Sequence, residues 1–305
     1  MARTATLEEE PSDEVYGARP INRRRASRAH IQRRRTSLCQ IVSCMRPMTV
    51  RQVFYQASVH GLVDKTEAGY KQVQNDLVRL RRDKVLPYGW LTDSTRWQRK
   101  PRAYDSPQEA AEDTARHYRK RLWTSAGVYV EVWLEKDALA GVVLPLTDKY
   151  DVPLMVSRGY ASLSFLHSAA ETISQMKRPA CIYHLGDFDP SGVDAGKKIE
   201  QTLRNFAPEA EIHFERLAVT MAQIIEWRLP TRPTKQTDSR AKSFGDLSVE
   251  LDAIEPGRLR ALVEEAILRH LSPTELEALK VAEESERETL MRFAEATRRR
   301  PGEAE

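Results

Sequence analysis

Cysteine is scarce in this 305-residue chain, which contains three, and long apolar runs are missing. Cys39, Cys44 and Cys181 are odd in number and lack the spacing of zinc ligands, so we expect neither a disulfide framework nor a zinc site. No apolar run approaches the ~20 residues that a membrane-spanning helix needs, and no hydrophobic signal segment precedes the first basic stretch. These absences predict a cytoplasmic protein with no membrane partner.

The sequence also lacks paired histidines and a nucleotide-binding loop. One long stretch of it lacks acidic residues. The seven histidines include no H-x-x-x-H pair, so we interpret each as structural. The chain has no G-x-x-x-x-G-K-[ST] motif, and we therefore expect no ATP hydrolysis by this chain. Between Val15 and Arg51 there is no acidic residue, whereas arginine is abundant. Such a run fits a phosphate-binding arm, although a solvated tail would have the same composition.

The most informative segment runs from Tyr183 to Gly192, where an apolar stretch ends in two aspartates spaced by one residue. Side chains alternate along a strand, so Asp187 and Asp189 are expected on one face where the strand stops. Ser191 is expected to cap a helix that begins at Val193. A D-x-D pair alone is often only a turn and a helix cap, so its meaning depends on what else reaches this edge of the sheet.

A glutamate upstream has the same position at the end of a predicted strand. The apolar run from Val128 to Leu134 predicts a buried strand, and Glu135 follows it directly. In open α/β sheets, ligands bind beyond the carboxyl ends of the strands, so Glu135, Asp187 and Asp189 are expected to share one site. Carboxylates suit Mg²⁺, which takes one or two of them and completes its shell with water and phosphate oxygens.

A second group of candidate residues lies on a helix that Thr49 is expected to cap. Its core-facing stripe has the i, i+3, i+4, i+7 spacing and consists of Val50, Val53, Phe54 and Ala57. Tyr55 falls off that stripe, and Arg51 lies four residues before it on the same face. A guanidinium near a phenol favours the phenolate and can hold the phosphate that it attacks. The alternative is an ordinary amphipathic tyrosine at a surface.

Together these residues resemble the A subunit of topoisomerase VI and the related enzymes that make meiotic double-strand breaks. Arg51, Phe54 and Tyr55 match the family's arginine, three residues, and then the attacking tyrosine with an aromatic before it. The segment 157–162 resembles the family's next loop, and 186–192 resembles its G-D-x-D-P-x-G turn, with phenylalanine in place of the usual proline. Order and approximate separations agree over residues 30 to 270.

The resemblance implies Mg²⁺-dependent cleavage and rejoining of double-stranded DNA by a nucleoid-associated protein. Tyr55 would attack a backbone phosphate and become linked to the 5′ end, while Arg51 orients that phosphate. Glu135, Asp187 and Asp189 would hold Mg²⁺, or Glu135 would instead protonate the departing 3′ oxygen. The family also implies a homodimer, in which the tyrosine of one subunit meets the metal site of the other. Strand passage would need a separate ATP-hydrolysing subunit of the B type.

The fold class that follows is a mixed α/β protein with two domains. The expected divisions are a disordered acidic, then arginine-rich tail over 1–28, a winged helix-turn-helix domain over 29–104, a linker helix over 105–124, and a Toprim domain with C-terminal helices over 125–305. Toprim is the metal-binding fold that the resemblance implies. Its strands, expected near 128–134, 152–156, 180–187 and 211–218, alternate with helices, which predicts a largely parallel sheet covered on both faces. The expected wing is a hairpin over 88–97.

The predicted DNA contacts are basic residues before, on and after the third helix, namely Arg33, Arg34, Arg35, Lys71, Arg79, Arg82 and Arg96. Two other functions remain open at this point. A metal-dependent hydrolytic nuclease of the Toprim type would need the acidic residues but not Tyr55, and it would leave no covalent adduct. A non-catalytic regulatory protein would bind DNA through the winged helix alone.

Overall fold

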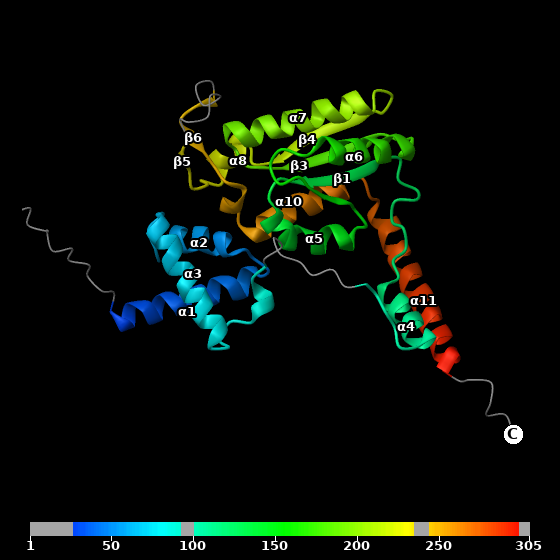
Figure 1. Cartoon of the computed structure of the whole chain (residues 1–305), viewed down its shortest axis with the longest axis horizontal. Helices are drawn as coiled ribbons and strands as arrows, with labels where there is room; N and C mark the ends of the chain where they lie inside the picture. Colours follow the sequence, from blue (N-terminus) through cyan, green and yellow to red (C-terminus); the bar gives the residue numbers. More distant parts are fainter. Residues whose placement is uncertain (1–26, 93–100, 235–243, 299–305) are drawn as a thin grey trace, which may run out of the picture.

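A computed structural model describes residues 27–92, 101–234 and 244–298 of the chain. The described residues form a three-helix unit, an α/β unit and a helical arm (Figure 1). The tail expected over 1–28 lies almost wholly outside the described residues, and Arg28 already belongs to the first helix. The mixed α/β class predicted from the sequence is confirmed.

The three-helix unit consists of α1 (Arg28–Met45), α2 (Val50–Val59) and α3 (Glu67–Arg82). Ser27, Thr49 and Thr66 cap these helices, and each side-chain oxygen accepts a hydrogen bond from the backbone N–H three residues later. The core between the helices is apolar and includes Leu38, Val42, Val53, Phe54, Ala57, Val73 and Leu77. The stripe predicted on α2 therefore faces this core, although the same helix is also buried on its other side.

The hairpin expected after α3 differs from the structure in its first residues. Tyr88–Trp90 forms a short 3-10 helix, η1, because the N–H groups of Trp90 and Leu91 donate to the carbonyls of Pro87 and Tyr88 and close local turns. Leu91 then makes a parallel bridge to Met48, just before α2. The rest of the expected hairpin, with Arg96, falls in 93–100 and lies outside the described residues.

The α/β unit contains a four-stranded parallel sheet in the order β2-β1-β3-β4. Its strands are β1 (Tyr129–Leu134), β2 (Leu154–Val156), β3 (Ala180–Leu185) and β4 (Ile212–Ala218). The helices of the unit are α5 (Ala140–Lys149), α6 (Leu163–Met176), α7 (Pro190–Phe206), α8 (Met221–Glu226) and α10 (Pro256–Leu268). Shorter elements are η2 (Asp137–Leu139), η3 (Leu251–Ala253) and a hairpin of β5 (Arg232–Pro233) with β6 (Leu247–Ser248). The predicted alternation of strands and helices is confirmed.

Apolar cores lie on both faces of this sheet, as parallel strands require. Val130, Val132 and Leu134 of β1 point into the core shared with α5 and α10. Trp133 points into the opposite core, beneath α6 and α7. Both faces are thus covered over β1 and β3, whereas His213 and Glu215 of the edge strand β4 are exposed.

The arm pairs α4 (Pro107–His117) with the long C-terminal α11 (Pro273–Arg298) and projects from the α/β unit (Figure 1). The linker helix was expected over 105–124, but α4 ends at His117. The residues after it bond to α11 instead: Tyr118 and Lys120 reach Glu286. No helix among 27–92, 101–234 and 244–298 is long and apolar enough to cross a membrane.

Candidate active site

A cleft of about 940 Å³ separates the three-helix unit from the carboxyl end of the sheet. Helices α2 and α3, together with the α2 cap residue Thr49, contribute to its lining Val50, Arg51, Tyr70, Lys71, Gln74, Asn75, Val78 and Arg81. The α/β unit contributes Lys136, Asp137, Asp187, Asp189, Arg232, Glu250 and Asp252, among others. Four of the predicted site residues, Arg51, Lys71, Asp187 and Asp189, are therefore brought together here, whereas Tyr55 and Glu135 do not line the cleft.

The two aspartates after β3 have different partners. Asp187 accepts a hydrogen bond from the backbone N–H of Leu251 at 2.8 Å. Asp189 caps α7, because its Oδ1 accepts the N–H of Gly192 at 2.8 Å. The prediction that Ser191 caps a helix from Val193 was wrong: the carboxylate three residues before Gly192 takes that place, and the helix begins at Pro190.

Glu135 approaches the turn closely enough to bond with its backbone. Its Oε2 accepts the N–H of Asp187 at 2.9 Å. Two glycines make room for this approach: a Cβ at Gly186 would lie 2.7 Å from Glu135 Oε2, and one at Gly192 would lie 2.5 Å from the carbonyl oxygen of Asp187. Glycine is needed at both positions because any side chain would force the glutamate or the turn to move.

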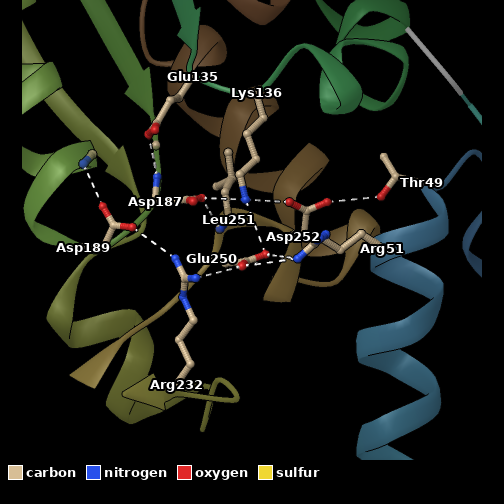
Figure 2. Close-up of polar contacts among 12 residues, drawn as sticks. Thr49, Arg51, Glu135, Lys136, Asp187, Asp189, Arg232, Glu250, Leu251 and Asp252 are labelled. Atoms are coloured by element: carbon tan, nitrogen blue, oxygen red, sulfur yellow. Dashed lines mark hydrogen bonds and ion pairs between the residues drawn. The ribbon is translucent and has the colours of Figure 1, made fainter. Parts of the chain in front are cut away.

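Lys136, next to Glu135, is the centre of an ion-pair network that the sequence did not predict. Its Nζ lies 3.0 Å from Asp187 Oδ1, 2.8 Å from Asp252 Oδ2 and 3.6 Å from Glu250 Oε2 (Figure 2). Burial alone would lower the pKa of this amine, but the three carboxylates raise it above its ordinary value. Lys136 therefore remains charged and links the D-x-D turn to the segment that leads into η3.

Two arginines complete the network. Arg51 Nη1 lies 2.9 Å from Glu250 Oε2, so this residue of α2 is paired with the α/β unit rather than with Tyr55. Arg232 contacts Asp189 at 3.1 Å and Glu250 at 3.3 Å, as Figure 2 shows. Arg232 and Glu250 lie far along the chain from the predicted motifs, and no local pattern marked them.

Tyr55 is only 4% exposed and packs into the apolar core of the α/β unit. Burial, followed by the charge of Glu250, raises the pKa of its phenol well above the ordinary value, although Lys136 and Arg51 act in the opposite direction. Arg51 therefore does favour the phenolate, as expected, but its effect on the pKa is smaller than that of burial. Desolvation dominates, and the guanidinium is already paired with Glu250.

Glu135 and Asp187 have the donor chemistry that Mg²⁺ prefers. Burial, and then the nearby charge of Asp187, raise the pKa of Glu135 to about 7. Glu135 Oε1 and Asp187 Oδ2 take part in no hydrogen bond or ion pair within the described part of the chain. Two such carboxylates, with water and phosphate oxygens, meet the needs of Mg²⁺. No three His, Cys, Asp or Glu side chains of the described residues are arranged as a metal site.

The predicted DNA contacts on α1 and α3 divide into two groups. Arg34 is 8% exposed, and its Nε lies 2.7 Å from Asp76 Oδ2, while Arg35 Nε lies 2.8 Å from the other oxygen. As folded, these two arginines join α1 to α3 and neutralise a buried carboxylate, so they are not free phosphate contacts, in contrast to the prediction. The exposed members of the predicted set are Arg33, Lys71, Arg79 and Arg82.

No protein-family model matches this chain, and no similar protein was found among the curated proteins. The geometry of the cleft and the resemblance of its motifs are therefore the basis for inferring a function.

Proposed function

We propose that this chain cleaves double-stranded DNA by Mg²⁺-dependent tyrosine transesterification, as its resemblance to topoisomerase VI A subunits implies. One observation carries the proposal. Arg51, one helical turn before Tyr55 on α2, pairs with Glu250, and Lys136 contacts both Glu250 and Asp187. A tyrosine on α2 and the acidic ends of β1 and β3 are thus electrostatically connected, although they lie far apart in the sequence.

In the proposed reaction the Tyr55 phenol gives up its proton to solvent, and its oxygen attacks phosphorus and displaces the 3′ oxygen, which takes up a proton. Of the three carboxylates that the resemblance implies, Glu135 and Asp187 each have an oxygen without a partner among the described residues, and they would hold Mg²⁺, which when bound supplies positive charge to the phosphate. A carboxyl group with a pKa of about 7 has both of its forms at neutral pH. Ionised Glu135 can therefore serve as a metal ligand, and protonated Glu135 as the acid that protonates the 3′ oxygen.

Tyr55 has to leave its buried position before it can reach a phosphate. Polar contacts between α2 and the η3 segment include the pair of Arg51 with Glu250 and a hydrogen bond of 3.2 Å from Thr49 Oγ1 to Asp252. Separating α2 from η3 would remove the burial that raises the Tyr55 pKa. It would also release the Arg51 guanidinium, which could then bind the phosphate in a bidentate manner.

Hydrolysis by a metal-dependent nuclease is the second candidate, and the position of Tyr55 favours it. A phenol that is 4% exposed does not act on a bound strand without movement of α2, whereas Asp187 and Asp189 line the open cleft as folded. In that mechanism water attacks phosphorus, and no bond to the protein forms.

Trapping the reaction on plasmid DNA distinguishes the two candidates. Wild-type protein is incubated with supercoiled plasmid and Mg²⁺, stopped with denaturant, and examined for protein joined to 5′ ends. We expect adducts with the wild type and none with Tyr55→Phe, which loses only the hydroxyl. Tyr183→Phe is the matched control, because that hydroxyl bonds to His270 outside the cleft. Undiminished cleavage by Tyr55→Phe would exclude transesterification and leave hydrolysis.

A further inference from the structure

Arg216 lies beneath the acidic turn and contacts only its backbone. The residue is on β4, opposite His184 of β3. Its guanidinium donates to the carbonyls of Gly186 at 3.0 Å, Gly192 at 3.3 Å and Val219 at 2.9 Å. It also donates to the carbonyl of Asp187. One side chain thus joins the end of β3, the first turn of α7 and the residue that follows β4.

No carboxylate of the described residues forms an ion pair with Arg216, which is unusual for a largely buried cation. Burial lowers the pKa of this arginine, while the charges of Glu135, Asp187 and Asp189 act in the opposite direction. Backbone carbonyls take the place of a counterion. Four acceptors at fixed angles match the planar, forked donors of arginine, and a lysine ammonium cannot reach them together.

The hydrogen bonds on the two sides of the turn show how Arg216 orients its peptide groups. In a planar trans peptide the C=O and N–H groups point in opposite directions. The carbonyl of Gly186 points to Arg216, so the N–H of the same peptide, that of Asp187, points to Glu135 at 2.9 Å. The next peptide repeats the pattern: the Asp187 carbonyl bonds to Arg216, and the Phe188 N–H bonds to Val249 at 2.8 Å.

We propose that Arg216 is the positioning residue of the acidic site. By holding the carbonyls on one side of the turn, it directs the Asp187 N–H to Glu135 and fixes these two carboxylates relative to each other. The inference deepens the proposed function, since it concerns the residues that would hold Mg²⁺. It requires that the hydrogen bonds of the Arg216 guanidinium, rather than its charge, determine how well the site binds a cation.

The hydrogen-bonding geometry of Arg216 and its positive charge lead to opposite predictions for the effect of a substitution on cation affinity. Loss of the fork frees the turn and weakens binding, whereas loss of a nearby positive charge strengthens it. Arg216→Lys keeps the charge and removes the fork, and Arg216→Gln removes both. Arg269→Lys is the matched control, because Arg269 forms an exposed pair with Glu215 next to Arg216 on the chain.

The experiment measures Mn²⁺ binding by electron paramagnetic resonance without DNA, on proteins whose thermal unfolding shows that they are folded. We expect Arg216→Lys and Arg216→Gln both to weaken binding by roughly tenfold or more, the usual effect of losing a residue that orients metal ligands, and Arg269→Lys to match the wild type. Wild-type affinity in Arg216→Lys, or tighter binding by Arg216→Gln, would overturn the inference.

A second measurement uses the wild type alone. Hydrogen exchange followed by mass spectrometry should show slow exchange over residues 186–188, where the structure pairs each backbone N–H; fast exchange there would refute the fixed turn. Failure of the proposed function and failure of the positioning role give different experimental results. A wild type that binds Mn²⁺ in an Arg216-dependent manner but forms no tyrosine-linked DNA would refute transesterification and support the positioning role. A folded wild type that binds no Mn²⁺ would overturn both.

Discussion

Asp187 and Asp189 have identical side chains, but only Asp189 caps a helix. Asp189 caps α7, and Asn serves as well as Asp at such a position, while Ala does not. We therefore expect Asp189→Ala to lower the free energy of unfolding by about 1 kcal/mol and Asp189→Asn to lower it much less. Urea unfolding of the two variants measures the difference. Equal losses would mean that the carboxylate stabilises the protein through Arg232 rather than through the cap.

His184 is fully buried in β3, and neither ring nitrogen has a hydrogen-bond partner within the described residues. Burial, and then the charge of Arg216, lower its pKa to about 3. Between pH 3 and pH 6.5 the unfolded chain binds a proton here and the folded protein does not, so stability is lost as pH falls below about 6.5.

We expect this histidine to contribute a slope of about 1.4 kcal/mol per pH unit to the free energy of unfolding below pH 6. His184→Gln should remove that contribution, and His167→Gln, a change at an exposed position of α6, should not. Urea unfolding at several pH values between 4.5 and 7 provides the comparison. A slope in His184→Gln identical to that of the wild type would show that the buried ring is not the group that titrates.

At the scale of elements, α1 is attached to α3 by one carboxylate shared between two arginines. Asp76 is buried and lies within 2.8 Å of both Arg34 and Arg35. Removing one member of a buried ion pair leaves an uncompensated charge, so Asp76→Asn should lower the free energy of unfolding by about 3 kcal/mol. Arg33→Gln, an exposed change on the same helix, should leave stability unchanged and weaken DNA binding instead. Chemical unfolding and a DNA-binding titration of both variants test this division.

At the scale of the whole molecule, the proposed mechanism requires the three-helix unit and the α/β unit to separate before Tyr55 is accessible. Glu250 holds Arg51 of α2 and also contacts Lys136 and Arg232, so it connects both sides of the cleft. Hydrogen bonds to charged groups contribute about 1.5–3 kcal/mol each. Glu250→Gln should therefore favour separation of α2 from η3 by about tenfold or more.

Hydrogen exchange over residues 50–59 measures this separation. We expect faster exchange in Glu250→Gln than in the wild type, and unchanged exchange in Glu264→Gln, whose partner Lys149 lies on the surface away from α2. The variant should also titrate Tyr55 at a lower pH, because Glu250 is one of the groups that raise its pKa. Exchange at the wild-type rate would show that apolar packing alone keeps α2 in place.

The sequence by itself determined the four strands of the sheet and the edge at which the acidic residues gather. Strand and helix periods, the cap at Thr49 and the carboxylates that follow β1 and β3 are local patterns, and local patterns depend on neighbours along the chain. Ser191 shows the limit of prediction from local patterns: it was expected to cap α7, but the structure has Asp189 as the capping residue. The alternation of elements was enough to predict a parallel sheet covered on both faces.

Only the tertiary structure decided which charged groups form ion pairs and which groups are desolvated. Arg51 pairs with Glu250 and Thr49 with Asp252, each across some two hundred residues, and no spacing in the sequence encodes such a contact. Tyr55 lies off the stripe of its own helix and would be exposed on an isolated α2, but a second core covers it. Desolvation depends on everything that packs around a group, so the raised pKa of Tyr55 and the roles of Lys136 and Arg216 follow from the assembled fold.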